Sequence, residues 1–361
     1  MSLKKIAELT GTSVSTVSRV LNHPEHSCNR PGLTEKIWEA ANSLNYIPHA
    51  AARNLRLGTT EDTGHFTVDI FLTRFDSMDT DLFFRELFQH IREELIWQDC
   101  LLGEILSSEN IIASEKASPA AETIPYKSAA KPRADARRRE AALMPKKPDT
   151  GLIILGKCPS ELVPLLKKRY DYIAGIDRNP TDYEYDEVVC SGLAAAEKAV
   201  EYLISLGHKN IAYIGDCTYE ARYIGYYQAL LNHKIPIDYV NIHPSDQTME
   251  QGFAIMNAII HSPRRPTAVF CANDCTALGA LKALRQSKKR GYVPSIISID
   301  NINDSQKSTP MLTTIDIPKK EMGHLALTLL LDRKKGAHRE NVRIELPCRL
   351  IERDSCSYHP D

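Results

Sequence analysis

Residues 4–22 read KKIAELTGTSVSTVSRVLN, which predicts two short helices joined by a tight turn. The apolar face predicted for the first helix consists of Leu3, Ile6, Ala7 and Leu9. In the second helix the apolar residues at helical spacing are Val14, Val17, Val20 and Leu21. Gly11-Thr12-Ser13 interrupts the pattern, and Ser13 is a good N-cap. A third helix is expected from near Thr34, with inward-facing Ile37, Ala40, Ala41 and Leu44, which completes a helix-turn-helix module.

The outward face of the second predicted helix carries small side chains and one arginine, namely Val14, Ser15, Ser18 and Arg19. Small residues let a helix approach base edges in the major groove, where an arginine makes two hydrogen bonds to guanine. Ser13, Thr16 and the helix N-termini suit phosphate contacts. The pattern therefore favours DNA binding, while a surface helix or a protein-interaction module remains the alternative.

Charge is distributed unevenly along the chain, although the formal net charge is only −1. Residues 1–58 contain seven Lys or Arg and four Glu, whereas the remainder contains 38 basic and 42 acidic residues. A basic head on an acidic body is typical of a module that meets phosphates.

Two long motifs carry a resemblance to a known family. Residues 7–22 follow A-x-x-x-G-x-S-x-x-T-V-S-R-V-L-N, and residues 45–55 follow N-Y-x-P-x-x-x-A-R-x-L. They resemble the DNA-binding head of the LacI/GalR family of bacterial transcriptional regulators, apart from a longer loop at residues 23–33. The resemblance implies that Val14 and Ser15 read bases and that Arg19 makes the family's arginine contact. The predicted DNA contacts are Ser13, Val14, Ser15, Thr16, Ser18, Arg19, Asn22, Tyr46, Ala52 and Leu55.

Residues 48–60 are predicted to form a hinge helix and linker. Pro48 can begin a helix and Gly58 can end it, but a helix this short is unstable in isolation and should order only on binding. The resemblance implies that two hinge helices pair in the minor groove, where Leu55 wedges between base pairs and Ala52 faces it. A flexible tether is the alternative.

The body of the chain alternates apolar runs with helical stretches. The runs are His65–Leu72, Gly151–Leu155, Tyr172–Ile176, Asn210–Ile214, Thr267–Ala272, Ser295–Ile299 and Met311–Ile315. The helical stretches include Phe83–Trp97, Leu193–Leu206, Ala221–Leu231, Met249–His261 and Thr276–Gln286. This rhythm predicts parallel sheets, and its length favours two doubly wound lobes over one. Ligands in such folds bind at strand carboxyl ends, which here places the site between the lobes.

The body also resembles the same family, in LISLGHKNIAYIGD (203–216), FCANDCTALGALKAL (270–284) and ISIDNINDS (297–305). The expected fold class is therefore a small all-α helix-turn-helix head plus an α/β, two-lobed, periplasmic-binding-protein-like sensor with parallel doubly wound sheets. GLIILGK (151–157) and IDRNP (176–180) lean towards the branch of β-galactosidase-gene repressors.

The resemblance also implies effector contacts. Arg222 matches a family arginine that holds ligand oxygens, and Asn273 and Asp300 match polar positions that contact sugar hydroxyls. Phe75 and Phe83 or Phe84 are candidates for an apolar face, and Asp177 and Arg178 are weaker candidates at another strand end. The alternatives are a structural ion pair for Arg222, cap or turn roles for Asn273 and Asp300, and ordinary core for the phenylalanines.

The domain boundaries follow as 1–47 for the head, 48–60 for the hinge and 61–361 for the effector-binding and dimerisation domain. Within the last domain, about 107–148 is read as a solvated basic insertion. The nine cysteines include no CxxC pair, and Cys271 ends an apolar run, so buried thiols are favoured over a metal site with Cys275. No apolar stretch approaches the roughly 18 residues of a membrane helix, so a soluble cytoplasmic protein without membrane contact is expected.

The function expected is a homodimeric repressor on a pseudo-palindromic, double-stranded operator. Its small-molecule effector is expected to be a sugar that releases DNA, with a nucleobase corepressor or ligand-independent action as alternatives. No cofactor is expected. An enzyme is disfavoured because the chain has no G-x-G-x-x-G after a strand, no phosphate-binding P-loop and no G-x-S-x-G elbow.

Overall fold

The computed structural model describes residues 3–22, 32–34, 36–37, 40, 66–73, 81–107, 146–177, 179–218, 220–287 and 291–360. Contacts divide the chain into two compact units, residues 1–67 with 92–102 and residues 68–91 with 103–361. The predicted hinge at 48–60 and residues 108–145 of the predicted insertion lie outside the described residues.

The head begins with helices α1 (Leu3–Thr10) and α2 (Val14–Asn22), as the sequence predicts. The chain turns between them, where the amide of Thr12 donates to the carbonyl of Ala7 over 3.1 Å. Ser13 caps α2, because its Oγ accepts a 3.1 Å hydrogen bond from the amide of Thr16. The predicted N-cap is therefore confirmed.

The core of the head consists of the buried side chains Ile6, Ala7, Val17, Val20 and Ile37, with Leu3, Leu33 and Ala40 packed against it. The prediction that Leu9 faces inward is wrong, because its side chain is 57% exposed. At 100° per residue, Leu9 lies about 110° from the centre of the face formed by Leu3, Ile6 and Ala7, and an eight-residue helix buries only that face.

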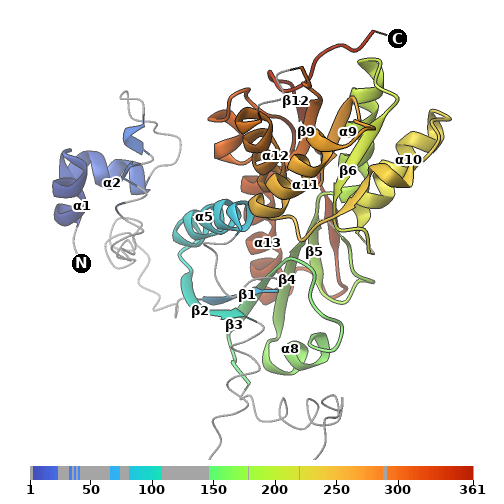
Figure 1. Cartoon of the computed structure of the whole chain (residues 1–361). Coiled ribbons are helices and arrows are strands. Elements are labelled where there is room, and N and C mark those ends of the chain that lie inside the picture. The colour runs from blue at the N-terminus through green and yellow to red at the C-terminus, as the bar shows by residue number, and fades with distance from the viewer. Residues whose placement is uncertain are drawn as a thin grey trace, which may run out of the picture. The chain divides into compact units, whose positions relative to one another are not determined.

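The first lobe is built on a six-stranded sheet in the order β11-β5-β4-β3-β1-β2 (Figure 1). Its strands are β1 (Thr67–Leu72), β2 (Leu101–Ser107), β3 (Thr150–Leu155), β4 (Tyr172–Asp177), β5 (Asp186–Val189) and β11 (Arg343–Glu345). The pairings of β3 with β4, β4 with β5 and β5 with β11 are parallel. The helices of this part are α5 (Leu82–Trp97), α8 (Val163–Arg169) and α13 (Lys319–Lys334), and α13 packs on β3, β4 and β5.

The second lobe contains a sheet in the order β12-β10-β9-β8-β6-β7. Its strands are β6 (Ile211–Gly215), β7 (Ile242–Pro244), β8 (Ala268–Cys271), β9 (Ser295–Asp300), β10 (Thr313–Asp316) and β12 (Arg349–Ile351). Only the β10–β12 pairing is antiparallel among those that the structure describes here. Two helix pairs flank the sheet, α9 (Gly192–Ser205) with α10 (Ala221–Asn232) and α11 (Met249–His261) with α12 (Asp274–Gln286). The short 3₁₀ helices are η3 (Tyr239–Asn241) and η4 (Asn303–Gln306).

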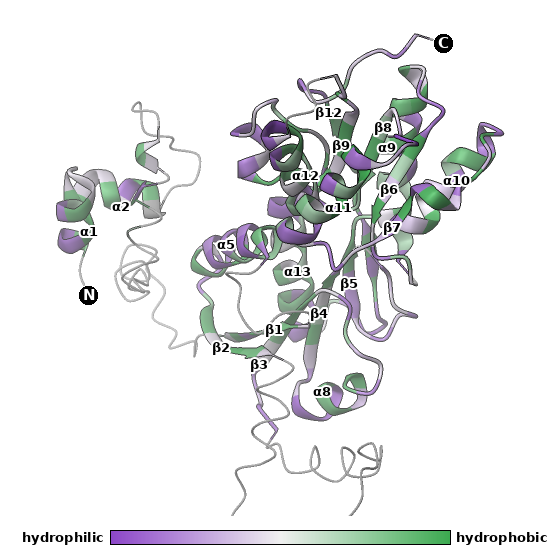
Figure 2. Cartoon of the chain, in the orientation of Figure 1, coloured by the Kyte–Doolittle hydropathy of each residue, from purple (hydrophilic) through white to green (hydrophobic). Residues whose placement is uncertain are grey.

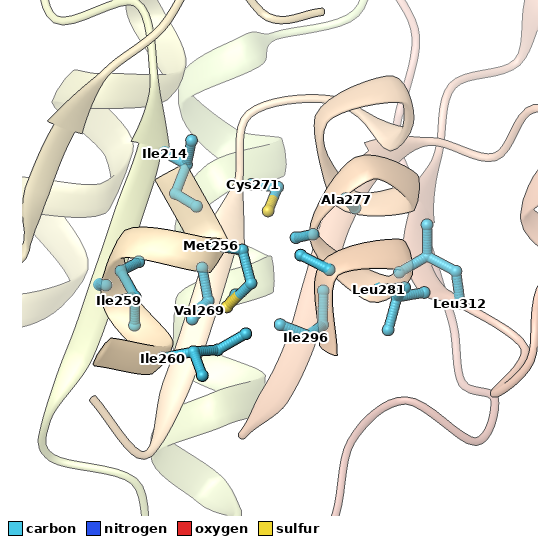
Figure 3. Packing of buried hydrophobic residues seen from close by; sticks show 13 residues of the cluster. Ile214, Met256, Ile259, Ile260, Val269, Cys271, Ala277, Leu281, Ile296 and Leu312 are labelled. Atoms are coloured by element: carbon cyan, nitrogen blue, oxygen red, sulfur yellow. The ribbon is translucent and has the colours of Figure 1, made fainter. Parts of the chain in front are cut away.

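Parallel strands buried on both faces explain the near-continuous apolar runs in the sequence. Figure 2 shows hydrophobic residues along β6, β8 and β9, whereas the surrounding helices carry both kinds of residue. Figure 3 shows part of the second lobe's core, where Cys271 packs among Met256, Val269 and Ala277. The predicted doubly wound parallel sheets are confirmed, and Cys271 is a core residue.

The sequence pattern does not predict β2, β5, β7, β11, β12, α8 or α13. Most of these strands have only three or four residues, too few for a pattern to stand out. The buried residues of helix α13 lie on one side, but further apolar residues such as Leu325 and Leu331 lie outside that side, so the sequence lacks the narrow apolar stripe that marks an amphipathic helix. In the part of the chain that the structure describes, no helix has the length and hydropathy needed to cross a membrane.

Candidate functional site: a polar cleft between the lobes

A cleft of about 280 Å³ lies between the two lobes. The first lobe contributes Thr73, Phe84, Gly156, Lys157, Asp177 and Asn179, and the second contributes Asp216, Thr218, Glu220 and Arg222. Thr73 follows β1, Gly156 follows β3, Asp177 ends β4 and Asp216 follows β6. The cleft therefore lies at the carboxyl ends of parallel strands, where α/β folds bind their ligands.

Arg222 is the most buried side chain of the cleft wall, with 1% of its surface exposed. Its Nε donates to Glu220 Oε1 over 2.8 Å, one terminal nitrogen donates to the Ala272 carbonyl over 2.7 Å, and the other donates to Gln247 Oε1 over 2.8 Å. These bonds hold the planar guanidinium in one orientation in the cleft wall. Arg222 therefore lines the cleft, where a ligand residue was predicted, and also forms the structural ion pair that was the alternative.

The protonation state of Arg222 is set by two opposing effects. Burial works against the charged form, but the adjacent Glu220 carboxylate outweighs it, and the pKa of Arg222 is raised. Glu220 also caps the start of α10 by accepting from the Arg222 amide over 3.5 Å. The cleft therefore contains a permanent cation whose charge is partly balanced within the wall.

Asn273 is not among the residues that line the cleft. Its Oδ1 caps α12 by accepting from the amide of Thr276 over 2.9 Å, and its Nδ2 donates to the Gln247 carbonyl over 3.0 Å. The structure thus assigns Asn273 to the capping alternative and places Gln247 between it and Arg222. Gln247 Nε2 is buried and has no hydrogen-bond partner among the described atoms.

Asp300 is likewise buried behind the cleft, with 2% of its surface exposed. It ends β9 with φ at +126°, and its carbonyl accepts from Lys319 Nζ over 2.6 Å. Its negative charge contributes to the raised pKa of Arg222, so the carboxylate lies near the guanidinium without lining the cleft.

The apolar wall of the cleft is Phe84, whose ring meets Phe83 edge to face at 5.3 Å. Gly156 lies against this ring with φ at +89°, and a Cβ there would come within 3.2 Å of Phe84 and collide with Thr73 Oγ1. Both the backbone conformation and the space therefore favour glycine at this position.

Polar groups of both lobes surround the remaining space. Asn179 joins the lobes directly, because its Oδ1 accepts from the Ala221 amide over 3.3 Å. Asp216 Oδ1 accepts from both the amide and the hydroxyl of Thr218, over 2.8 and 2.6 Å. Together with Asp177 and Lys157, these groups offer hydrogen-bond acceptors and donors to one small ligand.

The sequence predicted Phe84, Asp177 and Arg222 of this lining but missed Thr73, Gly156, Lys157, Asn179, Asp216, Thr218 and Glu220. The signal for most of them was available, since they follow a predicted strand by one to four residues. Phe75 and Arg178 lie outside the described residues. Among the described residues, no cluster of three or more His, Cys, Asp or Glu side chains could hold a metal ion.

The head presents its predicted base-reading residues to solvent. Val14 is 43% exposed, and Ser15 and Arg19 are also exposed, whereas Thr16 and Ser18 are half-buried. Asn22 is the last residue of α2. Tyr46, Ala52 and Leu55 lie outside the described residues.

Comparisons with known proteins cover both parts of the chain. Residues 2–49 match the model for bacterial regulatory proteins of the lacI family, and residues 200–356 match the periplasmic binding protein-like domain. The chain is 28% identical over 355 residues to the HTH-type transcriptional repressor PurR of Mannheimia succiniciproducens, covering 95% of each.

The fold is shared with solved structures of regulatory proteins. A LacI family transcriptional regulator from Enterococcus faecium, with bound ribose, is 25% identical with a TM-score of 0.62, over 81% of this chain and 100% of that one. The lac repressor dimer bound to operator and an anti-inducer is 21% identical with a TM-score of 0.61, over 98% of both chains. The two family matches together span more than half of the chain, in the order that the motifs predict. The chain therefore belongs to the LacI family of bacterial regulatory proteins and is a DNA-binding transcriptional repressor with an effector-binding domain.

Proposed function

We propose that the effector is a small polyhydroxylated molecule of the monosaccharide class, bound in the cleft between the lobes. The observation that carries the proposal is the convergence of Arg222, Asp177 and Asp216 on one cleft. Carboxylates accept hydrogen bonds from hydroxyl groups and the guanidinium donates to hydroxyl oxygens, so the set matches a polyol. Phe84 supplies one apolar face for a sugar ring.

The size of the cleft supports a compact ligand. Its volume of about 280 Å³ lies just below the ~300–1,000 Å³ range of small-molecule sites. Nine of its ten lining residues are polar, charged or glycine, and Phe84 is the one aromatic side chain among the lining residues that the structure describes. This composition favours hydroxyl recognition over stacking of a flat heterocycle.

A nucleobase corepressor is the second candidate, and the relatives named PurR favour it. Such a ligand would stack its planar ring on Phe84 and would strengthen operator binding. A monosaccharide would instead release the operator. The two candidates therefore differ both in ligand chemistry and in the sign of the response.

On the DNA side, we propose that two chains bind a pseudo-palindromic operator, with Val14, Ser15 and Arg19 reading each half-site. Hinge helices within 48–60 pair in the minor groove, and Leu55 wedges between base pairs at the centre. Effector binding changes operator affinity through a coupling free energy of about 1–3 kcal/mol. A protein with this task acts in the cytoplasm, and no catalytic step is assigned to the cleft.

The test uses the purified full-length chain with a panel of monosaccharides, including ribose and galactose, and a panel of nucleobases, including guanine and hypoxanthine. A true effector raises the Tm in proportion to RT ln(1 + [L]/Kd). We expect a monosaccharide to do so and to release an operator selected from random DNA. Stabilisation by a nucleobase alone would transfer the proposal to the second candidate. Stabilisation by neither would favour a ligand-independent regulator, and turnover of any compound would revive an enzyme.

A further inference from the structure

Three segments of chain connect the two lobes. Residues 190–191 lead from β5 to α9, residues 317–318 lead from β10 to α13, and residues 346–348 lead from β11 to β12. Any opening or closing of the cleft must rotate the backbone within these segments, because they alone join the two sheets covalently along residues 146–360. They form the hinge between the two lobes of the effector-binding domain, which is separate from the predicted hinge helix at residues 48–60.

Two cysteines lie side by side in this hinge. Cys190 belongs to the first segment and Cys348 to the third, and their side chains are in hydrogen-bond contact. The parallel pairing of β5 with β11 brings the segments together, since Val189 pairs with Glu345 and accepts a 2.8 Å hydrogen bond from the Leu346 amide. Cys190 is fully buried, whereas 7% of Cys348 is exposed. Neither residue lines the cleft.

The Cys348 thiol is more acidic than those of Cys217 and Cys356. The contact with Cys190 and the charge of Lys198 outweigh burial and lower the pKa of Cys348 to about 7. Lys198 Nζ lies close, because it donates to the Cys348 carbonyl over 2.9 Å. By contrast, burial raises the pKa of Cys217 to about 11 and that of Cys356 to about 12. The thiolate is the reactive form of cysteine, so Cys348 is the most nucleophilic of these thiols at neutral pH.

We propose that Cys190 and Cys348 form a peroxide-sensitive switch, in which a disulfide between them ties two of the three hinge segments. The Cys348 thiolate attacks one oxygen of hydrogen peroxide, breaks the O–O bond and becomes a sulfenic acid, while the other oxygen leaves as water after protonation. The Cys190 sulfur then attacks the Cys348 sulfur, and the sulfenic hydroxyl leaves as a second water. Two thiols are oxidised by two electrons, and one peroxide is reduced to two waters.

The disulfide would act on the hinge and not on ligand contacts. A covalent bond between segments 190–191 and 346–348 restricts their relative rotation, so the lobes lose part of their freedom to open. The proposal does not depend on the identity of the effector. It makes the response of the repressor conditional on the redox state of the hinge.

The test treats the reduced full-length protein with a few equivalents of hydrogen peroxide in native buffer. We expect the nine thiols, counted after denaturation, to fall to seven, with one cross-linked peptide pair that contains Cys190 and Cys348 and separates with dithiothreitol. Cys190→Ser should stop at a sulfenic acid on Cys348 that dimedone traps. Cys356→Ser is the matched control and should still form the bond.

Hydrogen exchange reports the effect on the hinge without any ligand. The amides of Cys190, Ser191, Leu346 and Cys348 should exchange several-fold more slowly in the oxidised protein than in the reduced one. Nine remaining thiols, a bond between other cysteines or oxidation only after thermal unfolding would each overturn the switch. A Cys190–Cys348 bond that leaves exchange in these segments unchanged would overturn its action on the hinge.

Discussion

Arg222 Nε lies 2.8 Å from Glu220 Oε1, and the two side chains form an ion pair that is almost completely removed from solvent at the start of α10. Arg222 also bonds to Ala272 and Gln247, so one guanidinium connects α10, the end of β8 and the segment before α11. The cleft wall of the second lobe depends on this single side chain. Its removal should therefore affect both folding and ligand binding.

We expect Arg222→Met to destabilise the protein by about 3–5 kcal/mol, because Glu220 would stay buried without its cation. Effector binding should also be lost. Urea unfolding and thermal shift with the effector measure the two effects. The matched control is Lys167→Met, which breaks an exposed pair with Glu184 and should cost no more than about 1 kcal/mol. Equal costs for the two variants would contradict this account.

Gly156→Ala should weaken effector binding by about tenfold, or 1.4 kcal/mol, because the new Cβ pushes Thr73 and Phe84 into the cleft. The control is Gly336→Ala, which has a similar positive φ of +72° but open space around it. Both variants should lose stability through backbone strain of roughly 1–3 kcal/mol. Calorimetric titration should show weaker binding only for Gly156→Ala, and unchanged affinity there would argue against this wall of the site.

Stability should vary with pH through Asp274, which is fully buried in α12. Burial, followed by the charge of Asp300, raises the pKa of Asp274 to about 7, although Ser298 and Thr314 donate hydrogen bonds to it. A raised carboxyl pKa means that the folded state holds a proton which the unfolded state releases above pH 4. The stability that Asp274 contributes through this proton is fully present below pH 4 and is lost as pH rises to 7.

We therefore expect the stability of the wild type, relative to Asp274→Asn, to fall between pH 4 and pH 7 by up to about 1.4 kcal/mol per unit. Above pH 7 the difference should be constant. Chemical unfolding at a series of pH values measures it. A difference that is flat across the whole range would show that Asp274 is charged in the folded protein.

The stability that Asp186 contributes should depend on pH in the opposite direction. Arg333 donates to both of its oxygens over 2.7 Å and His338 to one over 2.9 Å. Burial favours the neutral acid, but these bonds outweigh it and lower the pKa of Asp186. The stabilisation is present above pH 4 and is lost as pH falls through the lowered pKa.

Asp186→Asn should accordingly cost about 3 kcal/mol at pH 7, and the cost should shrink in acid. Unfolding at pH 7 and pH 3 is the measurement. Asp304→Asn is the control, because its pair with Lys307 is exposed and should contribute at most about 1 kcal/mol at either pH. A cost for Asp186→Asn that is the same at both pH values would count against the charge pairing.

In the head, Arg19→Ala should reduce discrimination between operator and random DNA by about 1–3 kcal/mol while leaving thermal stability unchanged. Arg19 is exposed on α2, so we expect its loss to remove the proposed DNA contact and no packing. Lys4→Ala, an exposed cation on α1, is the matched control for charge alone. Equal loss of discrimination in both variants, measured by competition binding, would refute base reading by Arg19.

Much of the head could be predicted because its structure depends on neighbours in sequence. The spacing from Leu3 to Ile6 and Ala7, the spacing from Val17 to Val20 and the cap of Thr16 by Ser13 each involve residues three or four positions apart. The error at Leu9 arose because periodicity gives a face but not its width, which depends on how much of the helix its partners cover.

The site was only partly predictable. Strand ends and the family resemblance led to Phe84, Asp177 and Arg222 but not to the role of Gln247, and they gave the cap role of Asn273 only as an alternative. Whether a polar residue after a strand lines the cleft or supports it from behind is decided by contacts between elements far apart in the chain.

By itself, then, the amino-acid sequence determined the helix-turn-helix head and the alternation of strands and helices, because periodicity, capping and turn chemistry act within a few residues. Only the tertiary structure decided which residues of the two lobes share a cleft and that Cys190 meets Cys348. Those relationships come from sheet order and from chain segments that cross between the lobes, and no local pattern encodes them.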